Sequence, residues 1–208
     1  MELKPHYLVR VRGAVGLGTH RPIPPWVIAS LEYAPFLVIR RAENEDGYVP
    51  VGVRGGNRGQ RFAAWLSPGK AVEVITPYSL VDPVNWKSRV AESNPAIRTL
   101  HAVTPMMRDK GWDWGPTGSA GFELATGVST LRDESDLDLV VDLPDKLSIR
   151  SARSLMKDLE KIALVQLDIQ MNTPAGAVSM KEYTRSGDVL IKTRTGPLLK
   201  RAGSLWSC

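Results

Sequence analysis

The sequence has almost no cysteine, and its single thiol belongs to Cys208. A disulfide framework needs at least two cysteines, and a zinc site of the usual kind needs several cysteine or histidine ligands at short spacing. The three histidines, His6, His20 and His101, are scattered along the chain without such spacing. We therefore expect no disulfide and no structural zinc ion, and the histidines give no support to a Ser-His-Asp hydrolase.

Long hydrophobic runs are also missing. No apolar stretch approaches the length that spans a bilayer, and residues 1–5 lack the apolar segment of a secretory signal. Hydrophobic residues make up 43% of the chain and charged residues 24%, which is typical of a globular protein. We expect a cytoplasmic protein without a membrane segment, whose 208 residues form one domain or two small ones.

Positive charge is concentrated in two places within a net charge of +5. Residues 181–201 contain six basic and two acidic residues, and residues 54–61 contain Arg54, Arg58 and Arg61 without an acid. Each cluster is either a solvated surface or a site for an anionic partner, such as a polyphosphate, a nucleic acid or an acidic protein.

The first part of the chain shows short elements of mixed type. Alternating apolar residues predict strands at 6–12, 35–42, 48–55 and 71–77, and residues 26–34 predict a helix. Asn57 is a candidate cap for a further helix through residues 57–66. We expect an α+β domain over residues 1–82.

The second part, residues 83–208, has a clearer period. Two helices are predicted, one after Asn94 with Pro95 in its first turn and one over residues 148–162 with Ser148 as cap. Strands are predicted at 135–143, 163–171 and 188–193, and residues 121–127 predict a short strand or a segment bounded by turns. Alternating strands and helices indicate the α/β (α+β) class.

Carboxylates interrupt one face of the strand at 135–143. Asp136 and Asp138 point the same way, and two carboxylates so close repel each other unless a cation lies between them. Asp168 stands among apolar residues in the next strand, after a helix of about four turns. If the two strands are adjacent, the three aspartates form a cluster of oxygen ligands that suits Mg²⁺. A buried structural role for Asp168 is the alternative.

A Gly-Ser pair, Gly118 and Ser119, precedes this strand. Glycine allows backbone N–H groups and a neighbouring hydroxyl to approach a phosphate closely. Most such pairs are ordinary turns. Followed by Asp-x-Asp and a third aspartate one strand later, the pair indicates phosphoryl or nucleotidyl transfer.

This order of motifs resembles the nucleotidyltransferase superfamily. Within it, the chain resembles the phosphoribosyl-dephospho-CoA transferases of malonate decarboxylase, also called malonate decarboxylase holo-acyl-carrier-protein synthases. The resemblance lies in "PVGVRGGNRGQRFAAWL", "WGPTGSAGFELATG", "SDLDLVV", "LDIQMNTPAGAVSMKEY" and "VLIKTRTGPLL". It implies a nucleotidyltransferase-like catalytic domain on a mixed sheet over residues 83–208, which follows a smaller N-terminal domain in the chain.

The resemblance also implies a reaction. Such enzymes take 2'-(5''-triphosphoribosyl)-3'-dephospho-CoA and attach its phosphoribosyl-dephospho-CoA portion to a serine of the apo acyl-carrier subunit of malonate decarboxylase, and diphosphate leaves. The family's paired aspartates fall on Asp136 and Asp138. These two would hold Mg²⁺, while Asp168 would complete the site or activate the incoming hydroxyl.

Further residues are candidates for binding this donor. Gly118 and Ser119 would hold its terminal phosphates, and Lys192 and Arg194 would face charge on the leaving group. The arginine cluster Arg54, Arg58 and Arg61 would bind either the ribose-linked phosphates or the carrier protein.

Two alternatives stay open at this point. One is a Mg²⁺-dependent nucleotidyltransferase with a different acceptor. The other is a basic nucleic-acid-binding module, which the clustered aspartates disfavour because carboxylates repel phosphate when no metal is present.

Overall fold

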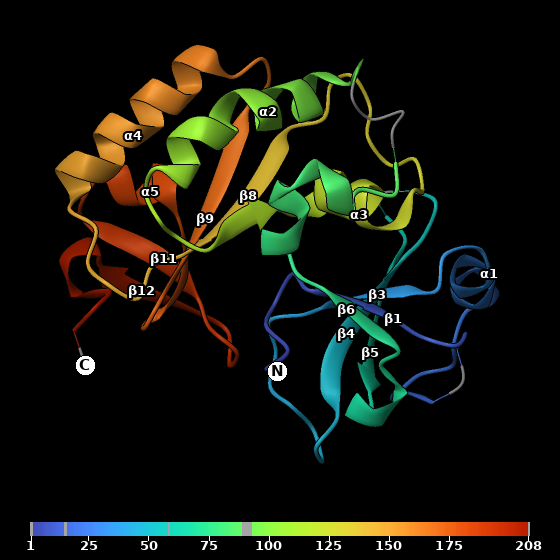
Figure 1. Ribbon diagram of the computed structural model, residues 1–208. Helices are drawn as coiled ribbons and strands as arrows, with labels where there is room; N and C mark the ends of the chain where they lie inside the picture. Colours follow the sequence, from blue (N-terminus) through green and yellow to red (C-terminus); the bar gives the residue numbers. More distant parts are fainter. Residues whose placement is uncertain (1, 15, 58, 89–92, 208) are drawn as a thin grey trace. The chain divides into compact units, whose positions relative to one another are not determined.

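The computed structural model describes residues 2–14, 16–57, 59–88 and 93–207. The chain divides into two compact units, Met1–Thr76 and Pro77–Cys208, a few residues before the boundary expected after residue 82. Each unit combines helices with its own six-stranded sheet (Figure 1). The expected two-part α+β architecture is confirmed.

The N-terminal unit combines an antiparallel sheet with an α-helix and a 3₁₀ turn. Its strands lie in the order β2-β5-β4-β3-β1-β6. Along the chain the elements are β1 (Leu8–Arg10), β2 (Leu17–Gly18), α1 (Pro25–Tyr33), β3 (Phe36–Ile39), β4 (Val49–Arg54), β5 (Arg61–Leu66), the 3₁₀ turn η1 (Pro68–Lys70) and β6 (Glu73–Ile75). The predicted helix at 26–34 and the four predicted strands are all present.

Residues of β5 alternate between the two faces of this sheet. Phe62, Ala64 and Leu66 are buried, and α1 supplies the fully buried Val27 and Leu31. Because strand side chains alternate and helical ones repeat every three to four residues, these positions build one core between α1 and the sheet.

The prediction of a helix that begins at Asn57 is wrong. Asn57 Oδ1 accepts the backbone N–H of Gln60 at 3.0 Å, and the N–H of Gly55 donates to the Gln60 carbonyl at 2.9 Å. Asn57 therefore caps the turn of the β4–β5 hairpin and not a helix. The period of two in the residues that follow is the signal for a strand.

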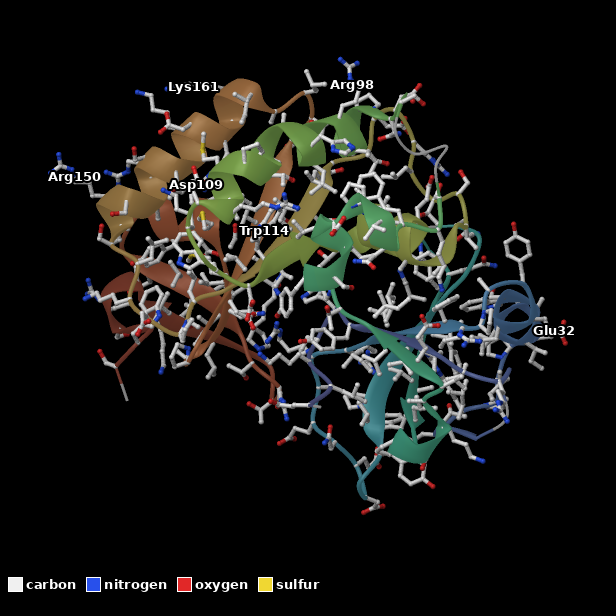
Figure 2. The ribbon with its side chains drawn as sticks, viewed as in Figure 1. Glu32, Arg98, Asp109, Trp114, Arg150 and Lys161 are labelled. Atoms are coloured by element: carbon white, nitrogen blue, oxygen red, sulfur yellow. The ribbon has the colours of Figure 1, made fainter. Side chains whose placement is uncertain are left out.

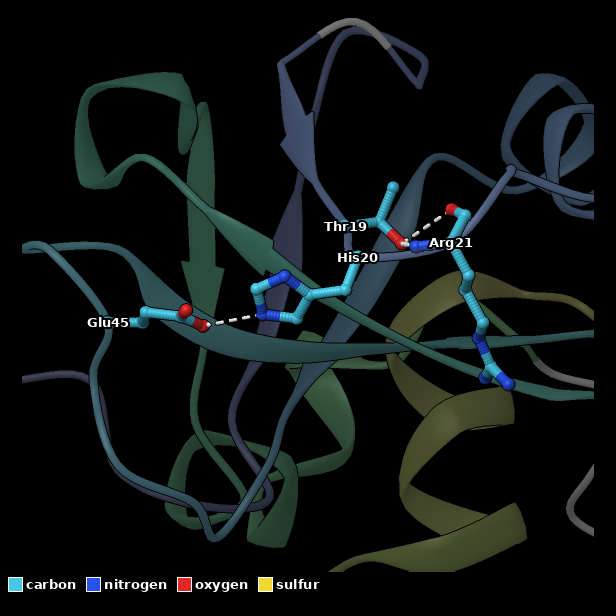
Figure 3. A network of polar contacts seen from close by, with 4 residues as sticks. All are labelled: Thr19, His20, Arg21 and Glu45. Atoms are coloured by element: carbon cyan, nitrogen blue, oxygen red, sulfur yellow. Dashed lines mark hydrogen bonds and ion pairs between the residues drawn. The ribbon is translucent and has the colours of Figure 1, made fainter.

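A polar network fixes the loop after β2 (Figure 3). Thr19 Oγ1 donates to the Arg21 carbonyl at 2.9 Å and accepts the Arg21 N–H at 3.2 Å. His20 Nε2 lies 3.1 Å from Glu45 Oε2, and the imidazole packs edge-on against Trp65 at 4.8 Å. The loop is thereby held to the edge of the sheet.

The C-terminal unit is built on a mixed sheet. Its strands lie in the order β12-β11-β10-β9-β8-β7, with β8 and β9 parallel and the other neighbours antiparallel. The elements are the 3₁₀ turns η2 (Tyr78–Val81) and η3 (Pro83–Asn85), α2 (Pro95–Arg108), β7 (Trp114–Pro116), α3 (Gly118–Thr126), β8 (Leu137–Asp142), α4 (Ile149–Ile162), β9 (Leu167–Thr173), β10 (Gly176–Ser179), α5 (Met180–Thr184), β11 (Asp188–Lys192), β12 (Pro197–Arg201) and η5 (Ala202–Ser204).

The two long helices begin where the sequence predicts. Asn94 Oδ1 accepts the N–H of Ala96 at the start of α2, and Ser148 Oγ accepts the N–H of Ser151 at the start of α4. Each cap satisfies a backbone donor that has no partner inside the helix. The helices pack against each other and lie across one side of β8 and β9 (Figure 1).

The sheet beneath them has two different faces. Odd-numbered residues of β8 and β9, such as Leu139 and Ile169, are buried against the helices. Even-numbered residues point to the other side, and we call this side the even face; Asp138 and Asp142 are half-buried there, and Asp168 is exposed. The α2–α4 layer therefore supplies the core of the unit, and the even face carries its polar groups.

Residues 121–127, expected to form a short strand or a segment bounded by turns, belong instead to the helix α3 and its end. Gly127 has φ +76° at the residue after α3, which is a left-handed helix terminus that glycine adopts at low cost. A glycine directly after an apolar run was the available signal for a helix end.

Gly115 in β7 lets two backbone segments touch. A Cβ on Gly115 would lie 1.9 Å from the carbonyl oxygen of Pro77, at the start of η2. Gly115 pairs with Val140 of β8, which is 1% exposed, so η2 covers this end of the even face.

We predict that Gly115→Ala destabilises the protein by about 3 kcal/mol, because backbone must move to admit the methyl group. Gly203→Ala is the matched control, since a Cβ there meets nothing within 4 Å and φ is ordinary. Urea unfolding followed by circular dichroism measures both. Equal midpoints for the two variants would show that η2 does not press on β7.

Candidate functional site

Parallel pairing of β8 and β9 sets two carboxylates side by side. Asp138 lies directly opposite Asp168, and Leu137 and Leu139 lie opposite Leu167 and Ile169. Paired residues of neighbouring strands point to the same side of a sheet, so both aspartates are on the even face. The two strands are therefore adjacent, which is the condition under which Asp168 can join the aspartates of β8. Since parallel neighbours need a crossover connection, α4 is what makes this pairing possible.

Asp136 precedes the first residue of β8 and is exposed. It lies two residues before Asp138, in the loop that leads into the strand. Asp138 is half-buried and Asp168 exposed. All three candidate aspartates thus belong to the same end of the β8–β9 pair.

The first residue of α3 packs directly against Asp138. A Cβ on Gly118 would lie 1.9 Å from Asp138 Oδ2 and 3.0 Å from Asp138 Cβ, and Gly118 has φ +58°. The N–H of Thr117 donates to the backbone carbonyl of Asp138 at 2.9 Å. Only glycine fits both the space and the backbone conformation here.

This contact gives the Gly-Ser pair its position. Gly118 and Ser119 form the first turn of α3, whose N-terminal end carries partial positive charge. The Thr117 side chain makes no capping hydrogen bond, Gly118 is exposed, and Ser119 is half-buried. A helix N-terminus beside a carboxylate is suited to a phosphate that a cation bridges to that carboxylate.

Glu123, to which the sequence assigns no role, is a buried structural anchor. Its carboxylate accepts the N–H groups of Thr130 at 2.7 Å and Leu131 at 2.8 Å, and it is 4% exposed. Thr130 Oγ1 also donates to the Ser119 carbonyl at 2.9 Å. These bonds tie the loop between α3 and β8 back to α3 and so direct the chain into the aspartate strand.

No metal-binding group is already assembled in the parts of the chain that the structure describes: no three His, Cys, Asp or Glu side chains gather closely enough to hold an ion. The paired carboxylates of Asp138 and Asp168 are nevertheless hard oxygen ligands in register. Mg²⁺ commonly takes one or two carboxylates and completes its coordination with substrate phosphates and water. The donor set therefore fits Mg²⁺ in the presence of a phosphate substrate.

Lys192 lies on the even face, as the aspartates do, but on a strand that is distant from them. A row of direct pairs runs from Asp142 through Asn172 and Ala177 to Lys192, one residue from each of four strands. Strands spaced about 4.8 Å apart put β11 roughly 14 Å from β8. Arg194 follows in the turn between β11 and β12 and is exposed.

The arginine cluster belongs to the N-terminal unit. Arg54 and Arg61 are direct cross-strand partners at the end of the β4–β5 hairpin. Arg58 lies outside the described residues. This pairing places two basic residues on the same side of the hairpin.

Two amide side chains that were not predicted as site residues share the even face with the aspartates. Gln170 and Asn172 follow Asp168 at even positions of β9, and both are half-buried. Asn172 Nδ2 donates to Asp142 Oδ1 at 2.8 Å. The alternation of polar and apolar residues in "LDIQMNT" places Asp168, Gln170 and Asn172 on one face. This alternation was the sequence signal from which the two amides could have been predicted.

Comparison with known families identifies both units. The profile of the phosphoribosyl-dephospho-CoA transferase MdcG C-terminal domain matches residues 81–202, and that of its N-terminal domain matches residues 4–77. The chain belongs to the phosphoribosyl-dephospho-CoA transferase family. The predicted family resemblance is confirmed, and with it the assignment of this chain as a transferase.

Curated relatives agree with the family profiles. The chain is 38% identical over 81% of its length to the phosphoribosyl-dephospho-CoA transferase of Pseudomonas fluorescens (strain Pf0-1), covering 80% of that protein. It is 35% identical over 92% of its length to the one from Azotobacter vinelandii, covering 91%, and 34% identical over 94% to one from Klebsiella pneumoniae (strain 342), covering 93%. No solved structure matches the chain significantly. Within the described residues, no helix of this transferase is both long and apolar enough to span a bilayer.

We predict that Gly118→Ala lowers transferase activity at least about 100-fold, because its methyl group displaces the Asp138 carboxylate from the N-terminus of α3. Gly127→Ala is the matched control at the other end of α3. Gly127 also has a positive φ, but a Cβ there would lie 3.5 Å from the Lys87 carbonyl oxygen, which is an ordinary van der Waals contact. Both variants should lose about 1 kcal/mol of stability. Urea unfolding and a transfer assay measure the two effects, and equal activity in both variants would contradict the prediction.

Proposed function

We propose that this transferase moves the phosphoribosyl-dephospho-CoA group from 2'-(5''-triphosphoribosyl)-3'-dephospho-CoA to a serine of the apo acyl-carrier subunit of malonate decarboxylase. The supporting observation is the pairing of Asp138 with Asp168 across parallel strands, directly beside the Gly118 end of α3, in a chain of this family. We place the reaction in the cytoplasm.

The chemistry is a displacement at phosphorus. The serine oxygen of the carrier forms a bond to the phosphorus attached to the donor ribose, and the bond from that phosphorus to the diphosphate breaks. The proton of the serine hydroxyl passes to a carboxylate. Asp168 suits this role, because it is exposed and opposite Asp138, with Asp136 as the nearby alternative.

Asp136 and Asp138 would hold Mg²⁺, and Asp168 would complete the metal site where Asp136 takes the serine proton. When bound there, the ion neutralises charge that develops on the phosphates. Asp138 itself stays against Gly118, and its contact with α3 keeps the carboxylate oriented. Orientation before substrate arrives reduces the reorganisation that the reaction requires.

The N-terminus of α3 would hold the diphosphate that leaves. Its backbone N–H groups and the Ser119 hydroxyl supply hydrogen-bond donors without a long side chain to order. Glu123 supports this turn indirectly, through Thr130 and the Ser119 carbonyl. The leaving group and the metal ligands would thus lie next to each other.

The basic residues would bind more distant parts of the substrates. Lys192, on the third strand from β8, and Arg194, in the turn that follows, suit the diphosphate within the dephospho-CoA portion or the carrier protein. Arg54 and Arg61, with Arg58, would bind the ribose-linked phosphates or the carrier. Each role uses the same chemistry, a guanidinium or ammonium donor to an anionic oxygen.

The proposal predicts a mass change that needs metal and Asp138. Apo carrier subunit incubated with the transferase, Mg²⁺ and the triphosphoribosyl donor should gain the mass of phosphoribosyl-dephospho-CoA. EDTA should abolish the gain, and Asp138→Asn should slow it at least about 100-fold, because an amide binds Mg²⁺ more weakly than a carboxylate. Intact-mass spectrometry over time measures the rates.

Asp142→Asn is the matched control, on the same strand and the same face but hydrogen-bonded to Asn172. It should transfer within a few-fold of the unaltered chain. Equal loss in both variants would mean that the strand, and not the aspartate pair, was damaged. Diphosphate release without a mass gain on the carrier would favour a nucleotidyltransferase with a different acceptor, and binding of nucleic acid without transfer would favour the basic binding module.

A further inference from the structure

The hairpin of β11 and β12 exposes large apolar side chains at the edge of the sheet. Every residue of β12 is exposed, including Leu198 at 51% and Leu199 at 72%, and Leu190 of β11 is 41% exposed. Leu190 and Leu199 are direct cross-strand partners. Single exposed leucines are ordinary, but a contiguous apolar pair across an edge strand and its neighbour is typical of an interaction surface.

The strand register places this pair on the even face with the aspartates. Lys192 belongs to the row that includes Asp142 and Asn172, and Leu190 lies two residues from Lys192 on the same side of β11. Because residues two apart in a strand share a face, Leu190 and Leu199 face the same way as Asp138 and Asp168. One side of one sheet therefore holds both the apolar pair and the candidate active site.

Basic residues surround the apolar pair. Lys192 and Arg201 share the face of the two leucines, and Arg194 lies in the turn between the strands, whereas Lys200 pairs with buried Val189 and lies on the other face. The acids nearby are Asp188 and Glu182, whose Oε1 accepts the N–H of Leu190 at 2.8 Å. The exposed Asp188 is paired with Arg201, with Arg201 Nε 3.3 Å from Asp188 Oδ1. The surface as a whole is thus apolar at its centre and positive at its rim.

We propose that the outer face of the β11–β12 hairpin, formed by Leu190, Leu199 and Arg201, docks the acceptor protein. The partner it fits is a polypeptide surface with an apolar side chain ringed by carboxylates. Docked there, the partner extends along the even face toward Asp138 and Asp168, where its serine reacts. The inference rests on the proposed function for the identity of this partner as the acyl-carrier subunit.

Charge and apolarity together favour a protein over a nucleic acid. Phosphate backbones are bound by basic groups and bases by aromatic stacking, and neither needs two exposed leucines. A protein interface uses an apolar centre for affinity and a charged rim for steering and orientation. The hairpin presents both features and, within its described residues, no aromatic side chain.

Two variants test the apolar centre and the charged rim separately. Leu199→Ser and Arg201→Glu should each raise the KM for the carrier at least about tenfold, while kcat and the KM for the donor stay within about twofold. The matched controls are Ile162→Ser at the end of α4, a 38% exposed apolar residue, and Arg98→Glu on α2. Arg98 projects outward from α2, and α2 and α4 cover the opposite side of the sheet (Figure 2). Both controls should leave all three constants unchanged.

A binding measurement separates this inference from the proposed function. Isothermal titration of apo carrier into the protein, with no donor present, should give binding that Leu199→Ser and Arg201→Glu weaken and the controls do not. Unchanged carrier affinity in both hairpin variants, or no carrier binding by the unaltered protein, would overturn the docking surface even if transfer occurs. If the unaltered protein binds the carrier but transfers nothing to it, and the hairpin variants lose this binding, the docking surface is supported and the proposed reaction is contradicted. Binding of a DNA duplex that depends on Arg201 in place of the carrier would also overturn it.

Discussion

The register between β8 and β9 is the constraint on which the candidate site depends. A parallel pair cannot be closed by a tight turn, so α4 must cross over the sheet and pack on it before β9 begins. Once α4 buries its apolar stripe, Asp138 stands opposite Asp168. A shift of β9 by one residue would turn Asp168 into the core and Leu167 and Ile169 toward the even face, away from Asp138. Burial of the leucines on one face thus fixes the strand register, and the register keeps two carboxylates side by side on the other face.

Close backbone approach is the second constraint. Gly115 and Gly118 stand three residues apart, and each occupies a place where a methyl group would collide. At Gly115 the backbone at Pro77 lies over the sheet, and at Gly118 the helix N-terminus meets the Asp138 carboxylate. The second contact brings the positive end of a helix dipole to an acidic group, which is the arrangement needed when a cation and phosphates are to be bound between them. Glu123 keeps this turn in place from inside the unit, by two backbone hydrogen bonds.

The C-terminal sheet divides stability and function between its faces. The side covered by α2 and α4 is built from leucine, isoleucine, valine and methionine and supplies the core. The even face carries aspartates at β8 and β9, amides further along β9, and leucines with basic residues at β11 and β12. On the even face, η2 and the first turn of α3 cover the β7–β8 end, and the side chains at β11 and β12 are exposed. The proposed docking of the acceptor gives a reason for the exposed apolar residues of the edge strand β12.

The sequence by itself determined the helix starts at Asn94 and Ser148, the alternating strands of both units, the Asp-x-Asp motif and the family, because caps, periods and motifs are local. It misled at Asn57, where an asparagine that caps turns and helices alike capped a hairpin turn, and at residues 121–127, where a short apolar run did not distinguish helix from strand. Only the tertiary structure decided that Asp168 pairs with Asp138, that Gly118 touches that carboxylate, that Glu123 anchors a loop, and that Lys192 lies three strands away. These relations join residues far apart in the chain, and they follow from strand order and register, which depend on how whole faces are buried and not on any local pattern.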